Sequence, residues 1–347
     1  MSGICGKEFQ CKSSRCLNVY EWNIVAATLH LCEALSCFII LNTNFWSQEK
    51  SIPAQILDVP ISVWERSANS SVPPSANLTC DTVGPTFMPS DEGEFTIYDV
   101  NVPYTEFRIE WAVIAFFLLS GVFQWIAACG KISKDRTGKT FYDYEALNNV
   151  ERNPLRFVEY AVSASLMLAI IARTSGLKNF YLIMLIAVAN VGCQFFGLIA
   201  EYTRSQLAFD QQGKRRKDDG DVWARWWTTD PMDTAGSNMF QIMLIAEVVG
   251  FIQYFGAYYP ILSHYFESIG SDCNEASPPD FVYVIVWSQA ALFGSFGVVQ
   301  LSSIIFSDKC RKAWWLCGNL EGAFVFLSLT AKSLLAWVLF ANVFLSA

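Results

Sequence analysis

Seven stretches of this sequence are each long and apolar enough to cross a bilayer as an α-helix, which needs about 20 residues. Inside the hydrocarbon core a spanning segment has to satisfy its own backbone hydrogen bonds, so such stretches fold as helices. A hydrophobic content of 53% with only 16% charged residues argues against a soluble globule. The sequence therefore predicts an all-α membrane protein, a seven-helix bundle with spans at residues 22–46, 109–130, 154–173, 178–203, 237–261, 280–307 and 320–346.

The segments between these stretches set the domain organisation. Residues 1–21 form a polar segment without an apolar core, which predicts that the chain has no cleaved signal peptide. Residues 22–347 form the membrane domain, and its one sizeable loop lies at about 47–108. In that loop the alternation in EFTIYDVNVPY suggests a short strand or hairpin that caps the bundle. The lipid bilayer is thus the main expected partner, and nothing in the chain indicates binding to nucleic acid.

The distribution of Lys and Arg predicts the orientation in the membrane. Eighteen of the 24 Lys and Arg residues fall on the N-terminal side of the predicted spans, and five fall on the opposite side. Because cytoplasmic loops carry the excess of positive charge, we expect the N-terminus in the cytoplasm and the C-terminus outside. The loop at 47–108 is then extracellular.

Two sequence features of the outer loops fit this orientation. Asn69 and Asn77 begin N-glycosylation patterns, although such patterns are common by chance in loops of this composition. Cys80 and Cys273 are the two cysteines expected on the oxidising side, so we expect them to form a disulfide. No Cys and His spacing in the chain matches a zinc site, and no metal is expected.

A single lysine, Lys332, lies near the middle of the last apolar stretch, LEGAFVFLSLTAKSLLAWVLFANVF. A charged side chain at this depth costs roughly 2.5–3.5 kcal/mol on insertion scales, and such residues are usually functional. An isolated amine in a dry pocket suits imine formation with an aldehyde. The alternative is a lysine that snorkels to an interface or pairs with a carboxylate for packing. About a dozen residues on either side argue against snorkelling.

Glu159 is the carboxylate that matches this lysine in depth. It lies 14 residues inside Arg173, and Lys332 lies 15 residues from Ala347. At about 1.5 Å per residue, both are roughly 21–22 Å from the outer surface. A protonated imine in a medium of low dielectric constant needs an opposite charge, so we interpret Glu159 as the counterion. The alternative is an interfacial glutamate beside Arg156.

Several motifs resemble the heliorhodopsins, a family of seven-helix retinal proteins: LHLCE, AFFLLSGVFQ, RFVEYAVSASLM, NVGCQFFGLIAEY and SLTAKSLLAW. The resemblance implies all-trans retinal as the cofactor, held as a Schiff base on Lys332 with Glu159 as counterion. It also implies a cytoplasmic N-terminus, which agrees with the charge count. We further expect a homodimer, an unidentified cytoplasmic signalling partner and no enzymatic activity.

The resemblance also implies a polar network near the imine, formed by side chains of five helices: Ser328, Ser163, Ser120, His30, Asn190 and Glu201. Taken alone, each serine is ordinarily a packing residue that bonds to its own helix. A lone histidine is likewise more often a satisfied packing residue than a proton carrier.

Three positions depart from the family pattern. Many family members have histidine where this chain has Gln124, which cannot accept the imine proton. Glu33 stands where a neutral amide is usual, on the same helix face as His30. Glu247 stands alone in the fifth span, where it is either protonated and bonded to a neighbouring helix or part of a proton path.

The function expected from these residues is light absorption with signalling through the cytoplasmic loops. A light-gated proton channel that uses Glu33, Glu159 and Glu247 is the alternative. A proton pump is disfavoured, because the helix position that often carries a proton donor is Ile170. A third interpretation is a protein without retinal whose lysine–glutamate pair is structural. Aromatic residues expected to line a retinal pocket are Trp287, Phe293 and Phe296.

Overall fold

A computed structural model of the chain describes residues 19–42, 55–66, 86–90, 93–134, 140–208, 234–270, 279–305 and 320–344. Seven of its helices have the length and hydropathy to cross a membrane, which confirms the predicted spans. They are α1 (Val19–Asn42), α2 (Ile109–Cys129), α4 (Pro154–Thr174), α5 (Phe180–Ala208), α7 (Thr234–Gly270), α8 (Asp280–Ile305) and α10 (Leu320–Leu339), which continues into the π-helical η4 (Phe340–Phe344).

The predicted end of the fifth span lies several residues before the end of the helix in the structure. The fifth span was predicted to end at residue 261, but α7 continues to Gly270 and carries Pro260 inside the helix. The added turns, LSHYFESIG, mix polar and apolar residues, so a search for apolar stretches does not include them. Proline is tolerated in such helices because neighbouring groups satisfy the backbone groups it leaves free.

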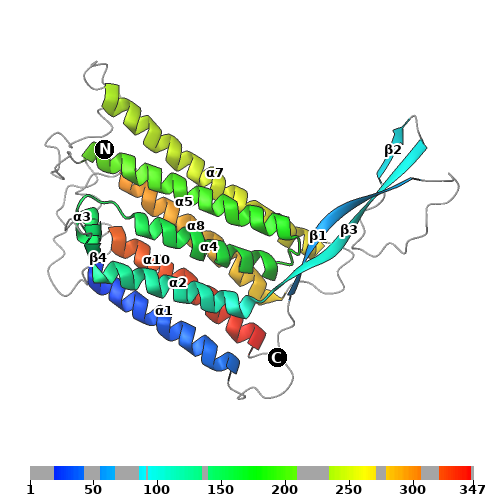
Figure 1. Cartoon of the computed structure of the whole chain (residues 1–347), viewed down its shortest axis with the longest axis horizontal. Coiled ribbons are helices and arrows are strands. Elements are labelled where there is room, and N and C mark those ends of the chain that lie inside the picture. Colours follow the sequence, from blue (N-terminus) through cyan, green and yellow to red (C-terminus); the bar gives the residue numbers. More distant parts are fainter. Residues whose placement is uncertain are drawn as a thin grey trace.

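A three-stranded antiparallel sheet projects from one end of the bundle, here called the sheet end (Figure 1). It consists of β1 (Gln55–Arg66), β2 (Thr86–Ser90) and β3 (Gly93–Phe107), in the order β1–β3–β2. The strand predicted in EFTIYDVNVPY is therefore confirmed as part of β3, although it belongs to a sheet rather than to one short hairpin. Asn69, Asn77, Cys80 and Cys273, with the proposed glycosylation and disulfide, lie outside the described residues.

The other end of the bundle, here called the hairpin end, carries elements that were not predicted. The strands β4 (Lys131–Lys134) and β5 (Thr140–Asp143) pair as an antiparallel hairpin, and the short helix α3 (Tyr144–Asn149) follows. Asn23 of α1 donates a hydrogen bond to the Tyr144 hydroxyl at 3.0 Å, which ties this helix to the bundle.

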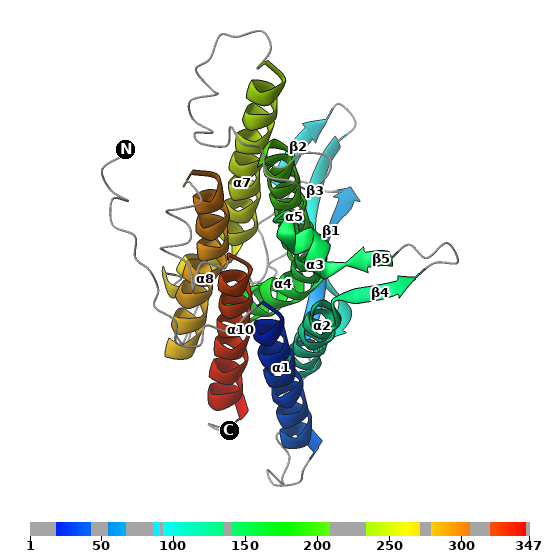
Figure 2. The ribbon, with the colours of Figure 1, turned by 90° about the vertical axis from the view of Figure 1, so that its left-hand side faces the viewer.

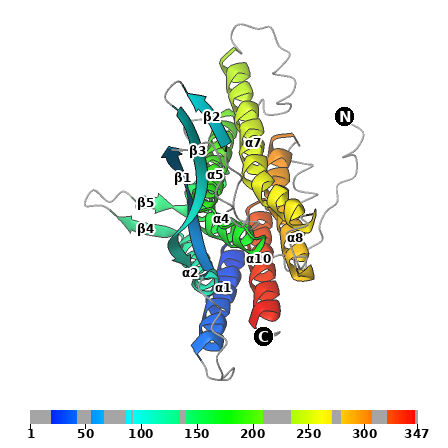
Figure 3. The ribbon, with the colours of Figure 1, turned by 90° about the vertical axis from the view of Figure 1, so that its right-hand side faces the viewer.

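The spanning helices form a closed ring in the order α1, α2, α4, α5, α7, α8 and α10, which returns to α1. Figures 2 and 3 show α4 between α2 and α5, with α7 and α1 at opposite extremes of the bundle. The start of α4 is defined by the Asn153 side chain, which accepts a hydrogen bond from the Arg156 backbone N–H at 3.3 Å, and by Pro154 in the first turn.

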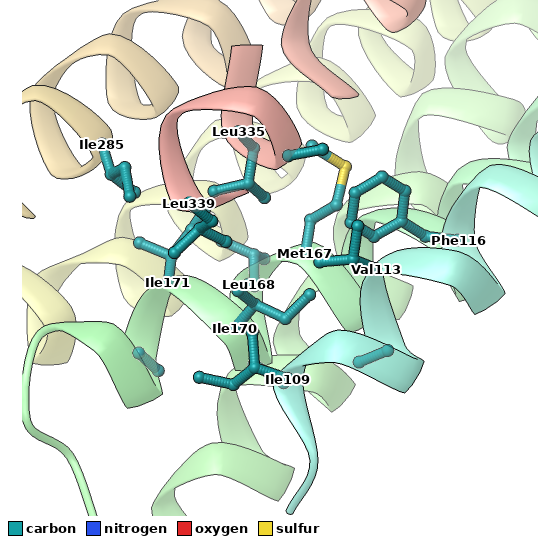
Figure 4. Close-up of a cluster of buried hydrophobic side chains, with 14 of the residues drawn as sticks. Ile109, Val113, Phe116, Met167, Leu168, Ile170, Ile171, Ile285, Leu335 and Leu339 are labelled. Carbon is teal, nitrogen blue, oxygen red and sulfur yellow. The ribbon is translucent and has the colours of Figure 1, made fainter. Parts of the chain in front are cut away.

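The sheet-end half of the bundle interior is filled by a hydrophobic cluster to which all seven spanning helices contribute, and Figure 4 labels the part of it that comes from α2, α4, α8 and α10. Its side chains include Ile109, Val113, Phe116, Met167, Leu168, Ile170, Ile171, Ile285, Leu335 and Leu339. The buried polar and charged side chains described below lie beside this cluster or toward the hairpin end. The sheet-end half of the interior is thus largely apolar, although Glu110 and Ser175 are also buried there, whereas the hairpin-end half is polar.

Candidate functional site

Lys332 and Glu159 form a buried ion pair inside the ring of helices. Lys332 Nζ lies 2.9 Å from Glu159 Oε1 and donates a second hydrogen bond to Ser328 Oγ at 2.7 Å. Lys332 is 2% exposed and Glu159 is 5% exposed. The two residues, which were counted to lie at equal depth in their helices, thus bring α4 and α10 into direct side-chain contact. A buried pair of this kind is costly to form unless further hydrogen bonds support it, which Ser328 provides here.

Tyr160, the residue after Glu159, completes the surroundings of the amine. Its ring centroid lies 5.2 Å from Lys332 Nζ, at a distance where a ring face attracts a cation. Its hydroxyl donates to the Phe324 carbonyl at 3.1 Å, and its ring packs edge-on against Phe296. Tyr160 therefore fixes the contact between α4, α8 and α10 beside the pair.

A large cavity, here called the main cavity, opens from the lysine into the bundle. It has about 890 Å³ of empty space, counting the part that opens between the helices. Side chains of α4, α5, α7, α8 and α10 line it: Arg156, Phe157, Tyr160, Ser163, Met167, Asn190, Cys193, Gln194, Glu247, Phe251, Tyr254, Phe293, Phe296, Gln300, Phe324, Ser328 and Lys332. An amine beside aromatic walls, with a carboxylate as opposite charge, is a donor set that fits a long apolar aldehyde such as retinal.

A smaller polar cavity lies on the other side of the ion pair. Its lining includes Gln124, Glu159, Arg156, Glu321 and Asn23. The Lys332–Glu159 pair therefore separates two spaces, since the lysine lines the main cavity and the glutamate lines the polar one.

Four buried polar atoms close to this region have no hydrogen-bond partner in the described structure: Gln124 Oε1, Ser120 Oγ, Ser163 Oγ and His30 Nε2. Buried polar atoms are normally paired, so these atoms indicate sites for water molecules or for a changing set of partners. Ser120 and Ser163, which the resemblance placed near the imine, and Gln124, one turn from Ser120, are thus buried with spare hydrogen-bonding capacity.

His30 and Glu33 form a second polar pair, on α1. His30 Nδ1 lies 3.2 Å from Glu33 Oε2, and the Trp337 indole N–H donates to the other carboxylate oxygen at 3.3 Å. His30 is fully buried, packs against Phe117 and lies within electrostatic reach of Lys332 and Glu159. A carboxylate only accepts hydrogen bonds, so this contact assigns the proton of a neutral His30 to Nδ1 and leaves Nε2 as an acceptor.

Arg156 organises the hairpin-end side of the polar cavity. Its guanidinium pairs with Glu201 of α5 and Glu321 of α10, and it stacks on the Phe324 ring at 3.9 Å. Asn153 donates to both carboxylates, through its backbone N–H and its side-chain amide. The eighteen Lys and Arg residues counted on the N-terminal side of the spans include Arg156, which is not a loop residue, because the first turn of α4 lies inside the bundle.

We expect Arg156→Met to lower the free energy of unfolding by roughly 3–5 kcal/mol, because two buried carboxylates lose their cation. Thermal unfolding of the purified protein in detergent measures the effect. Arg108→Ala is the matched control. The Arg108 side chain is exposed and its ion pair with Glu110 is long, at 4.0 Å, so removing it should change the free energy of unfolding little. Equal losses in the two variants would contradict the role of the network.

The remaining predicted residues occupy different positions relative to the two cavities. Asn190 lines the main cavity and donates to Ser165 Oγ at 3.0 Å, so it ties α5 to α4. Glu201 does not reach the lysine, because it is bound in the Arg156 network. Glu247 lines the main cavity from α7. Phe293 and Phe296 line it from α8.

Trp287 does not line the main cavity, so that part of the predicted pocket was wrong. Its side chain is 42% exposed on the outer surface of α8, where it packs against Phe266 and Tyr283. Phe293 lies six residues further along the helix and faces inward. Sequence reasoning missed Tyr160, Asn153 and Glu321 as site residues, and only the position of Tyr160 beside Glu159 could have indicated one of them.

These features define a class of protein: a multi-pass integral membrane protein whose seven helices enclose a buried lysine–glutamate pair beside a large cavity. The family model of the heliorhodopsins matches residues 75–214 and 232–344, and the chain belongs to the heliorhodopsin family. This match confirms the resemblance seen in the sequence. Members of the family are retinal-binding photoreceptor proteins. No curated protein matches the chain.

Proposed function

We propose that this heliorhodopsin is a light sensor that holds all-trans retinal as a protonated imine on Lys332 and signals through its cytoplasmic face. The observation that carries the proposal is the isolated Lys332 amine, 2.9 Å from Glu159 and open to a cavity with aromatic walls. When bound, retinal supplies light absorption and isomerisation. The protein supplies a fixed amine, an opposite charge and a water-poor enclosure.

The residues around the pair suit the control of a proton at the lysine nitrogen. Glu159 stabilises positive charge there, and Ser328 accepts a second hydrogen bond from the same nitrogen. We infer that His30 Nε2 receives the proton when that charge is lost, since this atom is a buried acceptor without a partner in the described part of the chain. The Glu33 carboxylate would stabilise the resulting imidazolium, as a carboxylate does beside a catalytic histidine.

This arrangement compensates for the helix 2 glutamine of this chain. Gln124 cannot accept a proton, but His30 lies one helix away and is paired with a carboxylate rather than with a neutral amide. Gln124 lines the polar cavity together with Glu159, and His30 Nε2 is a buried atom without a hydrogen-bond partner among the described residues. The two departures from the family pattern thus complement each other: Gln124 removes one proton acceptor, and Glu33 makes His30 a better one.

We propose that the hairpin end faces the cytoplasm and the sheet end faces outward. The excess of Lys and Arg, eighteen against five, supports this orientation, because Arg156 and Arg204 belong to the same end even though both are buried in the bundle. The unidentified signalling partner would then meet the hairpin end. A homodimer is part of the same proposal.

The hydrophobic cluster favours a sensor over a light-gated proton channel. A conducting path needs polar groups or water across the whole thickness, whereas the sheet-end half is packed with side chains such as Phe116, Ile170 and Leu335. The channel remains the second candidate, and the observation that favours it is the buried carboxyl of Glu247 in the main cavity.

We expect no photocurrent at any holding voltage in illuminated cells that express the pigment, because the hydrophobic cluster closes the sheet end. Whole-cell recording at several voltages and two external pH values makes the measurement. The visible absorption of the same cells controls for expression. A current that reverses near the proton equilibrium potential, and that Glu247→Gln removes without bleaching the pigment, would establish the channel instead.

A further inference from the structure

Glu247 is a buried carboxyl group that faces the main cavity and has no hydrogen-bond partner among the described residues. It is 5% exposed, it lines the cavity from α7, and its oxygens have no hydrogen bond within the described part of the chain. Burial of a polar group without a hydrogen bond is unfavourable, so such groups indicate that something else completes them. The open space beside this carboxyl is the cavity itself.

The carboxyl lies across the cavity from the lysine. α10, which carries Lys332, packs mainly against α8 and α1, whereas α7 packs mainly against α5 and α8. Figure 2 shows α7 and α10 as separate parts of the ring. A chromophore attached to Lys332 that extends through the cavity therefore has its free end on the α5–α7 side, where Glu247 lies.

The cavity wall around Glu247 offers other polar groups as well. Gln194 of α5 lines the same cavity and has no hydrogen-bond partner within the described chain. Cys193 also lines it and lies within electrostatic reach of Glu247. The ring of retinal is a hydrocarbon, so it cannot satisfy these groups. A ring that carries a hydroxyl group donates a hydrogen bond to the carboxyl and accepts one from the Gln194 amide.

We propose that Glu247 is a specificity-determining residue that selects a retinal with a hydroxylated ring over retinal itself. The inference rests on the proposed attachment of the aldehyde to Lys332 and goes beyond it by naming the chemistry of the free end. A site that hydrogen-bonds a hydroxyl discriminates against an analogue that lacks it, because the polar groups of the site are then left unpaired.

A competition experiment tests the proposal. Purified protein without chromophore is mixed with equal amounts of all-trans retinal and all-trans 3-hydroxyretinal, and the bound aldehydes are extracted and separated by chromatography. We expect the wild-type protein to bind the hydroxylated aldehyde in about fivefold excess, the factor that one net hydrogen bond supplies. Glu247→Leu should lose the preference, and Glu247→Gln, which keeps a hydrogen-bonding group, should retain most of it.

The control is Glu267→Leu, which removes an exposed carboxylate of the same helix that bonds to Ser263. It should leave the preference unchanged. Equal uptake of the two aldehydes by the wild type, or a preference that persists in Glu247→Leu, would overturn the inference. A separate portion of each preparation is mixed with retinal alone, and pigment formed there shows that the proposed attachment stands even if the selection fails. A wild type that binds neither aldehyde would overturn both the attachment and the selection.

Discussion

Lys332→Ala protein, purified without chromophore and mixed with all-trans retinal, is expected to form no covalent visible pigment. Alanine has no amine with which an aldehyde can form an imine, so the loss should be complete rather than partial. The measurements are the absorption spectrum after incubation and the mass of the denatured, borohydride-treated protein. The wild-type mass should rise by one retinal, and the variant mass should not change.

Lys178→Ala is the control for this variant, because Lys178 is an exposed lysine in the α4–α5 connection at the sheet end. It should form pigment like the wild type. If Lys332→Ala still formed a pigment that denaturation did not release, attachment at Lys332 would be wrong and another lysine would have to be sought. Loss of the folded protein is checked by its helical circular dichroism.

Glu159→Gln is expected to have the second-largest effect. The variant keeps the shape of the side chain and removes the charge that lies 2.9 Å from the lysine nitrogen. An opposite charge at such a distance favours the protonated form by roughly tenfold to a thousandfold, so much of the imine should be unprotonated at neutral pH. The visible band should therefore weaken while a band in the near ultraviolet grows.

Absorption spectra recorded across a range of pH values measure this effect. Glu110→Gln controls for the removal of a buried glutamate, because Glu110 lies at the sheet-end start of α2 and near Arg108 rather than near the lysine. It should leave the spectrum unchanged. Identical spectra and identical titrations for Glu159→Gln and the wild type would rule out Glu159 as the counterion.

The positions of the helices and of the central pair could be predicted from the sequence because both follow from simple constraints. A bilayer demands about 20 apolar residues per span, and a regular helix converts residue counts into depth. The equal depth of Lys332 and Glu159 follows from those two rules, whereas their contact also requires that both side chains face inward. Both side chains are also isolated charges among apolar residues, so few alternative partners compete for them.

The inward-facing side of each helix could not be predicted in the same way. In a membrane the lipid and the protein core are both apolar, so these helices are apolar around most of their circumference and carry little periodic signal. Trp287 and Phe293 have similar chemistry, yet one contacts the surroundings and the other lines the main cavity. The Arg156 network was missed for a related reason, because a basic residue at the end of a span reads as an interfacial anchor.

The hydrophobic cluster at the sheet end also limits what an absorbed photon can accomplish. If that half of the interior stays closed, a proton that leaves the Lys332 region and a proton that returns to it both pass through the hairpin end of the bundle. A protein that releases and takes up a proton on the same side of the membrane moves no net charge across it over a complete photocycle. The absorbed energy is then divided between heat and a temporary deformation of the helices. The lifetime of that deformation, rather than a stored gradient, becomes the quantity that another protein can read.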